Sequence, residues 1–356
     1  MEETDLSALS KLSGLLLPWY DKNKRDLPWR ENTDPYRVLV SEIMLQQTRV
    51  EAARAHYVRF LDALPDVQAL ADCPEDRLLK LWEGLGYYSR ARNLQRAAKI
   101  IAKDGFPRAA KELEKLPGVG KYTAGAIASI AFGQPAPAVD GNVVRVLARV
   151  LADGREQAIL RREYFGALAP AYPPARCGDF TQSLMELGAT VCLPASPRCA
   201  DCPLFSLCKT KSDALPRPEE KAARKKSEVG VFVFLNGETL FLCRRREGVL
   251  RGTYAFFCAD GCTDEESARE LLRGAHLSDF SLKKAGTHRH VFTHLEWEMT
   301  AFLVQTKEDV SRLTARPKGA HGDLCDLKPF SLAQAKAELS VPSAFRWVFA
   351  LLPEQA

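Results

Sequence analysis

The sequence lacks the features that would place it in a membrane or in a secreted or low-complexity class. Its longest apolar stretch, around residues 123–132, is far shorter than the ~20 residues that a membrane helix needs. The N-terminal segment Met1-Glu2-Glu3-Thr4-Asp5 is acidic overall, and no basic region precedes an apolar core as it would in a secretory signal. We find no internal repeat and no long low-complexity segment. We therefore expect a globular cytoplasmic protein without membrane contact.

A strong charge of one sign is also missing. The chain holds 50 Lys and Arg against 45 Asp and Glu, which gives a formal net charge of +5, and no block forms a basic tail. Nucleic-acid binding is compatible with this balance, but it has to come from local placement of charge. A length of 356 residues exceeds one ordinary hydrophobic core, so we expect two domains.

The first expected domain, residues 1–208, is all-α because strand-like alternation is almost absent. Asp34-Pro35 is a typical helix start, with an N-cap followed by Pro at the first position. Further helical stretches are expected around 51–63, 75–83, 90–103, 108–115, 121–132, 142–152, 161–171 and 179–190.

Residues 209–228 have few large apolar side chains and indicate a solvated linker. The second expected domain, residues 229–356, is α+β. A hairpin is predicted around a type I′ turn at Asn236-Gly237, because this dipeptide suits the left-handed backbone of that turn. A helix is expected from Thr263, with a capping box closed by Glu266, and strands return at 290–304.

Cysteine is abundant, with 10 residues in a chain expected in a reducing compartment. Six are scattered and are interpreted as small buried apolar residues: Cys73, Cys177, Cys243, Cys258, Cys262 and Cys325. The other four, Cys192, Cys199, Cys202 and Cys208, fall within 17 residues and indicate a metal centre. Only Cys199 and Cys202 form a close pair, so the spacing by itself leaves zinc and an iron–sulfur cluster open.

Three further features point to chemistry. Gly118 and Gly120 lie between two helical stretches, where their N–H groups and a helix N-terminus could hold a phosphate; a plain helix corner is the alternative. Glu42 lies on an apolar helix face, where burial would raise its pKa and make it a general acid, unless it reaches past its neighbours to water. Asp140 precedes a helix, and as an N-cap it should stay ionised with a lowered pKa.

Together these features resemble one family. Ser41-Glu42-Ile43-Met44-Leu45-Gln46-Gln47-Thr48, Gly84-Leu85-Gly86-Tyr87-Tyr88, the hairpin at 116–120, Val139-Asp140-Gly141-Asn142-Val143 and the four clustered cysteines occur in its order and spacing. The chain resembles the helix-hairpin-helix DNA glycosylases with a 4Fe–4S cluster, specifically the adenine DNA glycosylases of the MutY family. The resemblance favours iron–sulfur over zinc at the four cysteines.

The resemblance implies a monomeric enzyme that hydrolyses the N-glycosidic bond of adenine paired with 8-oxoguanine or guanine in double-stranded DNA. It implies that Glu42 protonates the base and that Asp140 stabilises the sugar cation, with Tyr122 and Asn142 in support. Implied contacts to DNA or to the lesion are Arg30, Gln47, Thr48, Leu85, Tyr87, Gly118, Gly120 and Arg198.

The second domain resembles the Nudix-like lesion-recognition domain of the same family. Phe292-Thr293-His294 matches the Phe-Ser-His loop of that domain, with Thr in place of Ser. The domain lacks the acidic Arg-Glu-x-x-Glu-Glu element that binds magnesium in Nudix hydrolases, so a recognition module is expected.

Two alternatives remain open. The first is another enzyme of the same superfamily, a bifunctional pyrimidine glycosylase/lyase or a thymine-mismatch glycosylase. Endonuclease III-like enzymes place a Schiff-base lysine where this chain has Tyr122, so a covalent imine is not expected here. The second is a non-catalytic DNA-binding module, against which the presence of both Glu42 and Asp140 argues.

Overall fold

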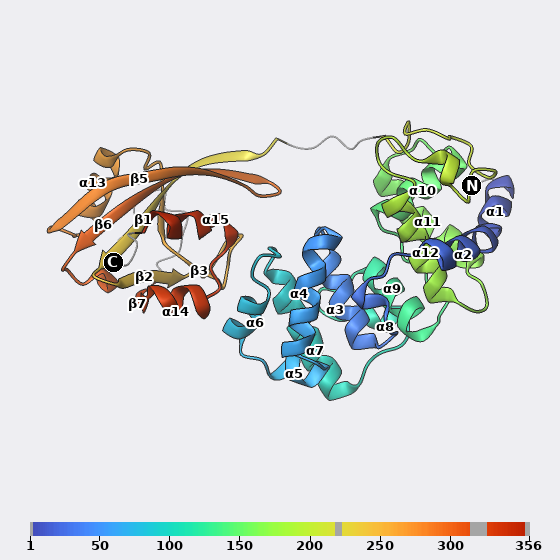
Figure 1. Ribbon diagram of the computed structural model, residues 1–356, viewed down its shortest axis with the longest axis horizontal. Helices are drawn as coiled ribbons and strands as arrows, with labels where there is room; N and C mark the ends of the chain where they lie inside the picture. Colours follow the sequence, from blue (N-terminus) through green and yellow to red (C-terminus); the bar gives the residue numbers. More distant parts are fainter. Residues whose placement is uncertain (1–2, 218–222, 314–325, 353–356) are drawn as a thin grey trace. The chain divides into compact units, whose positions relative to one another are not determined.

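The computed structural model describes residues 3–217, 223–313 and 326–352 (Figure 1). Packing divides the chain into two compact units, which we call the first unit (Met1–Asp72 with Asn93–Glu220) and the second unit (Cys73–Arg92 with Lys221–Ala356). The division differs from the sequence-based boundaries, because residues 73–92 pack with the C-terminal part of the chain. No helix among the described residues is both long enough and apolar enough to cross a membrane.

The described part of the first unit is helical, as expected. Its elements are α1 (Glu3–Ser10), α2 (Leu12–Asn23), η1 (Pro28–Arg30), α3 (Pro35–Leu45), α4 (Val50–Ala63), α5 (Val67–Asp72), most of α7 (Ser89–Asp104), α8 (Ala110–Leu113), α9 (Lys121–Phe132), α10 (Gly141–Leu151), α11 (Gln157–Leu168), η2 (Ala169–Ala171), α12 (Cys177–Thr190) and η3 (Cys199–Asp201). The two N-terminal helices and α5 were not expected from the sequence.

Local sequence explains where α3 begins, and packing explains why α9 is buried. α3 begins after Asp34, whose side chain accepts the Arg37 N–H at 2.9 Å, and Pro35 occupies the first position. α9 is buried from Thr123 to Ser129 because it lies between α3, α8 and α12. Such a helix has apolar residues all round.

Two glycines allow close approach around α9 and α12. A Cβ atom on Gly125 would lie 1.9 Å from the carbonyl oxygen of Pro137, and one on Gly188 would lie 2.6 Å from the Cβ of Asn142. The absence of side chains at these positions lets the 137–142 segment, which carries Asp140, pack directly against both helices.

The second unit contains a mixed seven-stranded sheet with the order β3-β2-β1-β6-β5, in which β4 also pairs with β1 and β7 with β2. The strands are β1 (Lys225–Asn236), β2 (Thr239–Arg244), β3 (Tyr254–Ala255), β4 (Phe257–Asp260), β5 (Phe280–Val291), β6 (Leu295–Thr306) and β7 (Leu327–Ser331). Among the strands that the structure describes, only β1 and β6 pair in parallel.

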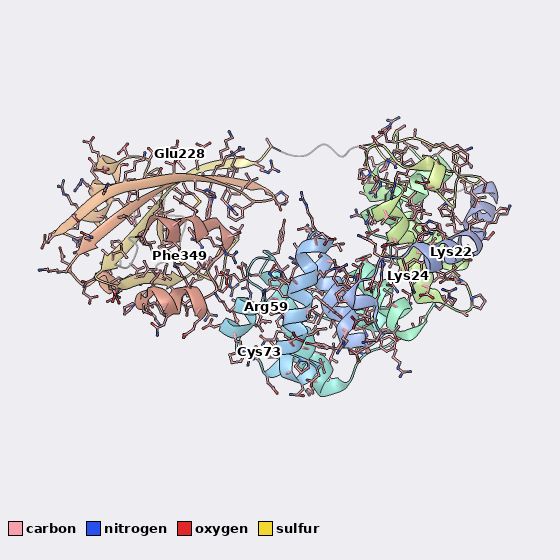
Figure 2. The ribbon with its side chains drawn as sticks, in the orientation of Figure 1. Lys22, Lys24, Arg59, Cys73, Glu228 and Phe349 are labelled. Atoms are coloured by element: carbon pink, nitrogen blue, oxygen red, sulfur yellow. The ribbon has the colours of Figure 1, made fainter. Side chains whose placement is uncertain are left out.

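Helices cover both faces of this sheet (Figure 1). They are α13 (Glu265–Gly274) on one face and α14 (Leu332–Ala337), α15 (Ser343–Arg346) and η5 (Trp347–Leu351) on the other; α6 (Glu75–Leu81) and η4 (Val310–Arg312) complete the unit. Phe349 packs on Phe256 with ring centroids 5.7 Å apart (Figure 2). The middle of β1 is buried continuously, as expected for a strand covered on both faces.

Three local predictions for this unit need correction. The hairpin forms, but Asn236 pairs with Thr239, so the turn is Gly237-Glu238, and only Gly237 has a positive φ; type I′ requires two. The N-cap of α13 is Asp264, which accepts the Ser267 N–H, and not Thr263. β1 already begins at Lys225, because polar residues at the end of the expected linker pair with β6.

The scattered cysteines are mostly as expected. Cys73, Cys177, Cys258 and Cys262 are buried. Cys243 is buried too, but it is disulfide-bonded, which the sequence did not indicate. Cys325 lies outside the described residues.

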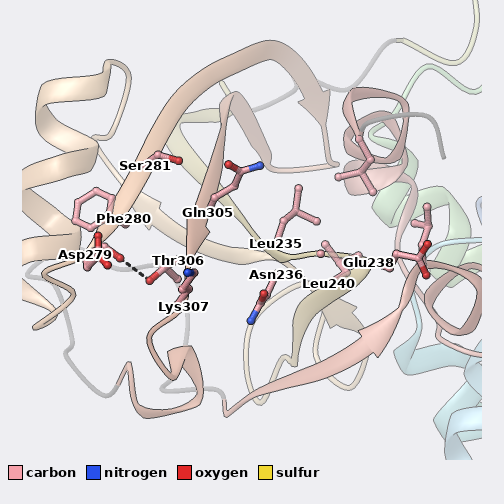
Figure 3. A pocket seen from close by; sticks show the side chains of 13 residues that line it. Leu235, Asn236, Glu238, Leu240, Asp279, Phe280, Ser281, Gln305, Thr306 and Lys307 are labelled. Carbon is pink, nitrogen blue, oxygen red and sulfur yellow. Dashed lines mark hydrogen bonds between the residues drawn. The ribbon is translucent and has the colours of Figure 1, made fainter. Parts of the chain in front are cut away.

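A pocket of about 560 Å³ opens where β1 turns into β2 and where β5 begins beside the end of β6 (Figure 3). Leu235, Leu240 and Phe280 contribute apolar lining, and the Thr306 hydroxyl donates to the carbonyl of Asp279 at 2.6 Å.

The close approach at Gly125 gives a test of the helical packing. Gly→Ala inside a helix normally stabilises by up to ~1 kcal/mol. Gly125→Ala should instead lower the free energy of unfolding by about 1–3 kcal/mol, because the new methyl overlaps the Pro137 carbonyl. Gly166→Ala on α11, where the Cβ meets open space, is the matched control and should be neutral or stabilising. Urea denaturation measures both, and equal behaviour of the two variants would contradict the packing.

Candidate active site

Glu42 lies on α3 with 6% of its surface exposed, which excludes the alternative that its carboxylate reaches water. The Tyr122 hydroxyl, at the start of α9, donates to its Oε2 at 2.7 Å. Burial raises the pKa of Glu42 to about 7; the Tyr122 hydrogen bond and the charge of Arg30 oppose this rise, and the nearby Asp140 adds to it. Burial also raises the pKa of Tyr122, so the phenol stays protonated. Glu42 is therefore a carboxyl that can carry a transferable proton near neutral pH.

Asp140 is the N-cap of α10, as the sequence predicted. Its Oδ1 accepts the Val143 N–H at 2.7 Å, and its Oδ2 accepts the Asn142 side-chain amide at 2.8 Å. The expected lowering of its pKa is wrong. Burial raises the pKa of Asp140 and outweighs the hydrogen bonds from Val143 and Asn142 and the charge of Arg145. These donors still favour the ionised form more than the single phenol donor at Glu42 does.

A third carboxylate, Glu186 on α12, was missed by the sequence analysis. It is fully buried and forms ion pairs with Arg25 at 2.7 Å and with Arg30 at 2.8 Å. The Arg25 guanidinium binds both carboxylate oxygens, and its backbone N–H donates as well. Burial alone would raise the pKa of Glu186, but these hydrogen bonds hold it at about 2. Glu42 and Asp140 thus have a raised pKa, and Glu186 is the carboxyl whose pKa is lowered.

Two arginines of α10 bind the cysteine loop, and Arg145 also binds Asn142. Arg145 donates to the side-chain oxygen of Asn142 at 2.9 Å and to the carbonyl of Cys192 at 2.8 Å. Arg149, 3% exposed, approaches the Cys192 sulfur at 3.4 Å and donates to the carbonyl of Leu193 at 2.7 Å. The backbone around the first cysteine is therefore fixed to the helix that Asp140 caps.

The four clustered cysteines are free, half-buried and line one pocket together with Arg149 and Phe205. Burial raises the pKa of Cys202 to about 11, and the other three thiols add to this rise, so the sulfurs lie close together. Within the described residues, no three or more potential ligands stand in the arrangement of a bound metal ion. The thiol set and the shared pocket fit the donors of an iron–sulfur cluster.

The glycine hairpin joins α8 to α9 as predicted, although α8 is shorter than expected. Gly118 has a φ of 79°, and a Cβ there would lie 2.7 Å from the Cβ of Asn93, while Gly120 is the N-cap of α9. On the same unit, Gln47 is exposed with a φ of 57°, and the Thr48 hydroxyl donates to the carbonyl of Gln46 at 3.3 Å. The exposed Arg198 donates to the carbonyl of Thr190.

The remaining predicted contact residues belong to the second unit. Leu85 is buried, whereas Tyr87 is 44% exposed and has a φ of 46°. Phe292 packs edge-to-face on Trp297 with centroids 4.9 Å apart. The exposed Thr293 forms a hydroxyl–hydroxyl hydrogen bond with Tyr87, and His294 is exposed beside it. The structure thus joins the 84–88 loop to the 292–294 loop, although 206 positions separate Tyr87 from Thr293.

The sequence held no signal for Glu186. Its neighbours one helical turn away are polar or small: Gln182, Ser183, Ala189 and Thr190. Glu42, in contrast, has Val38 and Leu45 at those distances. Arg25 has no local signal either, because its partner lies 161 positions away in the sequence.

Comparisons with known proteins agree with this geometry. Residues 40–169 match the family described as HhH-GPD superfamily base excision DNA repair protein. The structure of a thermostable thymine-DNA glycosylase is similar with a TM-score of 0.53 and 29% identity, covering 58% of this chain and 97% of that one. This likeness confirms the helical glycosylase fold.

Curated relatives narrow the family. The adenine DNA glycosylase of Homo sapiens is 46% identical over 221 residues, covering 58% of this chain but 40% of the human protein, so the chain spans about two fifths of that relative. The adenine DNA glycosylase of Buchnera aphidicola subsp. Acyrthosiphon pisum is 39% identical over 305 residues, covering 82% of this chain and 86% of the relative. The match over most of both chains shows that this chain belongs to the adenine DNA glycosylase family.

Proposed function

We propose that this protein removes adenine paired with 8-oxoguanine or guanine from duplex DNA. The observation that carries the proposal is the buried Glu42, a carboxyl with a pKa of about 7 held by Tyr122 near Asp140. An adenine inside the duplex is out of reach of these groups, so the base must be turned out of the stack first.

In the proposed reaction Glu42 transfers its proton to N7 of the extruded adenine. The C1′–N9 bond then breaks, and its electron pair leaves with the base. The ionised Asp140 stabilises the positive charge that develops on the sugar. Water attacks C1′ and gives its proton to the Glu42 carboxylate, which leaves an abasic site and free adenine. One proton-donating and one anionic carboxyl are the pair that glycoside hydrolysis requires.

The ion-paired Glu186 suggests how the base is held. Its carboxylate and the two arginines present charged acceptors and donors in a buried site, and Arg30 is close enough to lower the pKa of Glu42. Polar groups of this kind select a base by its own donors and acceptors, because a wrong base would leave buried charges unpaired.

The lyase alternative has less support. Tyr122 occupies the position where the lyases have a lysine, and its hydroxyl is bonded to Glu42. The neighbouring Lys121 has its Nζ 4.4 Å from the centroid of the Phe165 ring. Borohydride treatment with substrate would trap a lyase covalently, and we expect no such adduct.

A 4Fe–4S cluster is proposed at Cys192, Cys199, Cys202 and Cys208. Bound there, it would supply a rigid, redox-capable centre that organises residues 192–208, and Arg198 on this loop would face DNA. Excision itself needs only the carboxyl groups.

The second unit is proposed to be a Nudix-like module that recognises 8-oxoguanine through Phe292, Thr293 and His294. The hydrogen bond between Thr293 and Tyr87 supports this role, because it places a second aromatic side chain beside the loop. The direct test of the whole proposal is a glycosylase assay on duplexes that differ only in the base pair at one position. Adenine opposite 8-oxoguanine or guanine should be excised, and excision of thymine in preference to adenine would reject the proposal.

Excision should follow the protonation of Glu42. Because the raised pKa of about 7 means that the proton is lost above neutral pH, the single-turnover rate should fall about tenfold per pH unit on the alkaline side. It should also fall in acid as Asp140 gains a proton. Glu42→Gln should bind DNA but lose about 10²–10⁴-fold in rate. A wild-type rate that is constant from pH 6 to pH 9 would remove Glu42 from the role of acid.

The cysteine centre predicts a metal content. The purified protein should hold about four iron atoms per chain and little zinc. Cys199→Ser should lose iron and soluble yield, whereas Cys73→Ser, which changes a buried cysteine elsewhere, should keep its iron. Atomic absorption distinguishes the metals, and stoichiometric zinc in an active protein would contradict the assignment.

Lesion recognition predicts an effect of Thr293. Thr293→Ala removes one hydroxyl hydrogen bond, so the ratio of excision rates for 8-oxoguanine over guanine opposite adenine should fall by about 2- to 10-fold. Thr293→Ser should keep the ratio, and Ser281→Ala, an exposed hydroxyl at the pocket of Figure 3, is the control. Equal ratios in wild type and Thr293→Ala would place recognition elsewhere.

A further inference from the structure

Lys80, on α6, binds the end of a helix that lies far away in the sequence. Its ammonium group donates to the carbonyl oxygens of Lys336 at 2.7 Å and Leu339 at 2.9 Å, at and just beyond the C-terminus of α14. Carbonyls at a helix C-terminus lack partners within the helix, and a positive charge there is favourable. The same ammonium forms an ion pair with Glu83 at 2.7 Å. Three acceptors therefore match the three donors of Lys80.

Glu83 continues this connection to a second helix. One carboxylate oxygen meets Lys80, and the other lies 3.4 Å from the guanidinium of Arg346 on α15. The Glu83 side chain is only 13% exposed and that of Lys80 24% exposed, so water screens this group less than a surface ion pair. We call Lys80, Glu83 and Arg346 the α6 clamp.

The α6 clamp ends where the 84–88 loop begins. Gly84, Gly86 and Tyr87 have φ values of 100°, 66° and 46°, and the left-handed value at Tyr87 is unfavourable for a residue with a side chain. Such a backbone persists only where its surroundings hold it. On its own side, the loop is held by Trp82, which donates to the Gly86 carbonyl at 3.1 Å, and by Arg90, which donates to the Leu85 carbonyl at 2.9 Å.

The other end of the loop reaches the recognition residues through the Tyr87–Thr293 hydrogen bond. The loop is thus fixed before residue 84 by Lys80, which binds the end of α14, and by Glu83, which pairs with Arg346 of α15. At Tyr87 it is fixed by the 292–294 turn, and all these residues belong to the second unit. Loss of the first attachment would leave the loop held by its own Trp82 and Arg90 hydrogen bonds and by the Tyr87–Thr293 bond.

We propose that Lys80 and Glu83 are positioning residues for substrate discrimination. They fix the 84–88 loop against the 292–294 turn, so that recognition of 8-oxoguanine is coupled to opening of the base stack. This inference rests on the proposed function. Lys80 touches neither DNA nor the reacting atoms in this scheme, and it acts through the backbone of α14 and the carboxylate of Glu83.

The alternative is that the α6 clamp only attaches α6 to the sheet domain. Other contacts do this at the opposite end of the helix: Arg244 pairs with Glu75 at 3.2 Å and with Asp76 at 3.0 Å. These pairs lie at the start of α6, away from Glu83, so Arg244→Met weakens the attachment of α6 to the sheet without releasing the 84–88 loop. The Arg244→Met variant therefore separates the two explanations.

The experiment uses the full chain and compares Lys80→Met with Lys80→Arg, Lys336→Met and Arg244→Met. Lys336→Met matches the loss of charge but keeps the backbone carbonyl that Lys80 binds. Single-turnover excision and DNA affinity are measured on duplexes with adenine opposite 8-oxoguanine or guanine. Lys80→Met should lower the ratio of the two excision rates by about 2- to 30-fold, the range expected for coupling residues. Lys80→Arg should recover most of the ratio, and the other two variants should resemble wild type.

A second measurement needs no excision. In a Glu42→Gln background, 2-aminopurine placed next to 8-oxoguanine brightens when the stack opens, and Lys80→Met should reduce this signal. If the wild-type protein excises no adenine, the proposed function is wrong. The fluorescence comparison between Glu42→Gln and Glu42→Gln with Lys80→Met still tests the inference in that case. Should Lys80→Met fail to fold, Glu83→Gln replaces it with the same expected loss. An unchanged ratio and signal, or an equal loss in Arg244→Met, would overturn the inference.

Discussion

Burial of the Glu42 carboxyl is the constraint on which the site depends. Removing it from water moves its pKa from 4.5 to about 7, a preference for the neutral form of roughly 3 kcal/mol. That preference exists because the helices packed around α3 and α9 bury the carboxyl, and because Gly125 and Gly188 let the 137–142 segment pack against α9 and α12. The same packing half-buries Tyr122, which keeps its proton and its hydrogen bond. The chemistry of the acid thus follows from the geometry of the helices around it.

Three buried carboxyl groups in one unit show that partners, rather than depth, decide the charge. Glu186 is as buried as Glu42, but two guanidinium groups keep it ionised. Asp140 lies between these cases, with backbone and amide donors at a helix N-terminus. One core therefore holds two carboxyl groups with a raised pKa, Glu42 and Asp140, and one with a lowered pKa, Glu186.

The sequence predicted features that depend on neighbours along the chain. Asp34-Pro35, the hairpin at 116–120 and the N-cap at Asp140 are local, so residue type and spacing were sufficient. The pairing of Arg25 with Glu186 and the packing of residues 73–92 depend on contacts between distant segments, which no local pattern encodes. The predicted direction of the Asp140 pKa shift was wrong for a related reason, because burial is a property of the folded core. The clustered cysteines indicated a metal centre by density, but their spacing could not name the metal.

The division of the chain has a consequence for its biosynthesis. Residues 73–92 leave the ribosome early, yet they pack with the C-terminal part of the chain, so this segment lacks those partners while the intervening helical part is made. Its apolar residues Leu79 and Trp82, buried in the finished protein, stay exposed until those partners are synthesised. The helical part can therefore acquire most of its own structure during translation, while the 84–88 loop matures only after the last strands are released. The order of synthesis makes the loop the last part of the helical sequence to reach its final form.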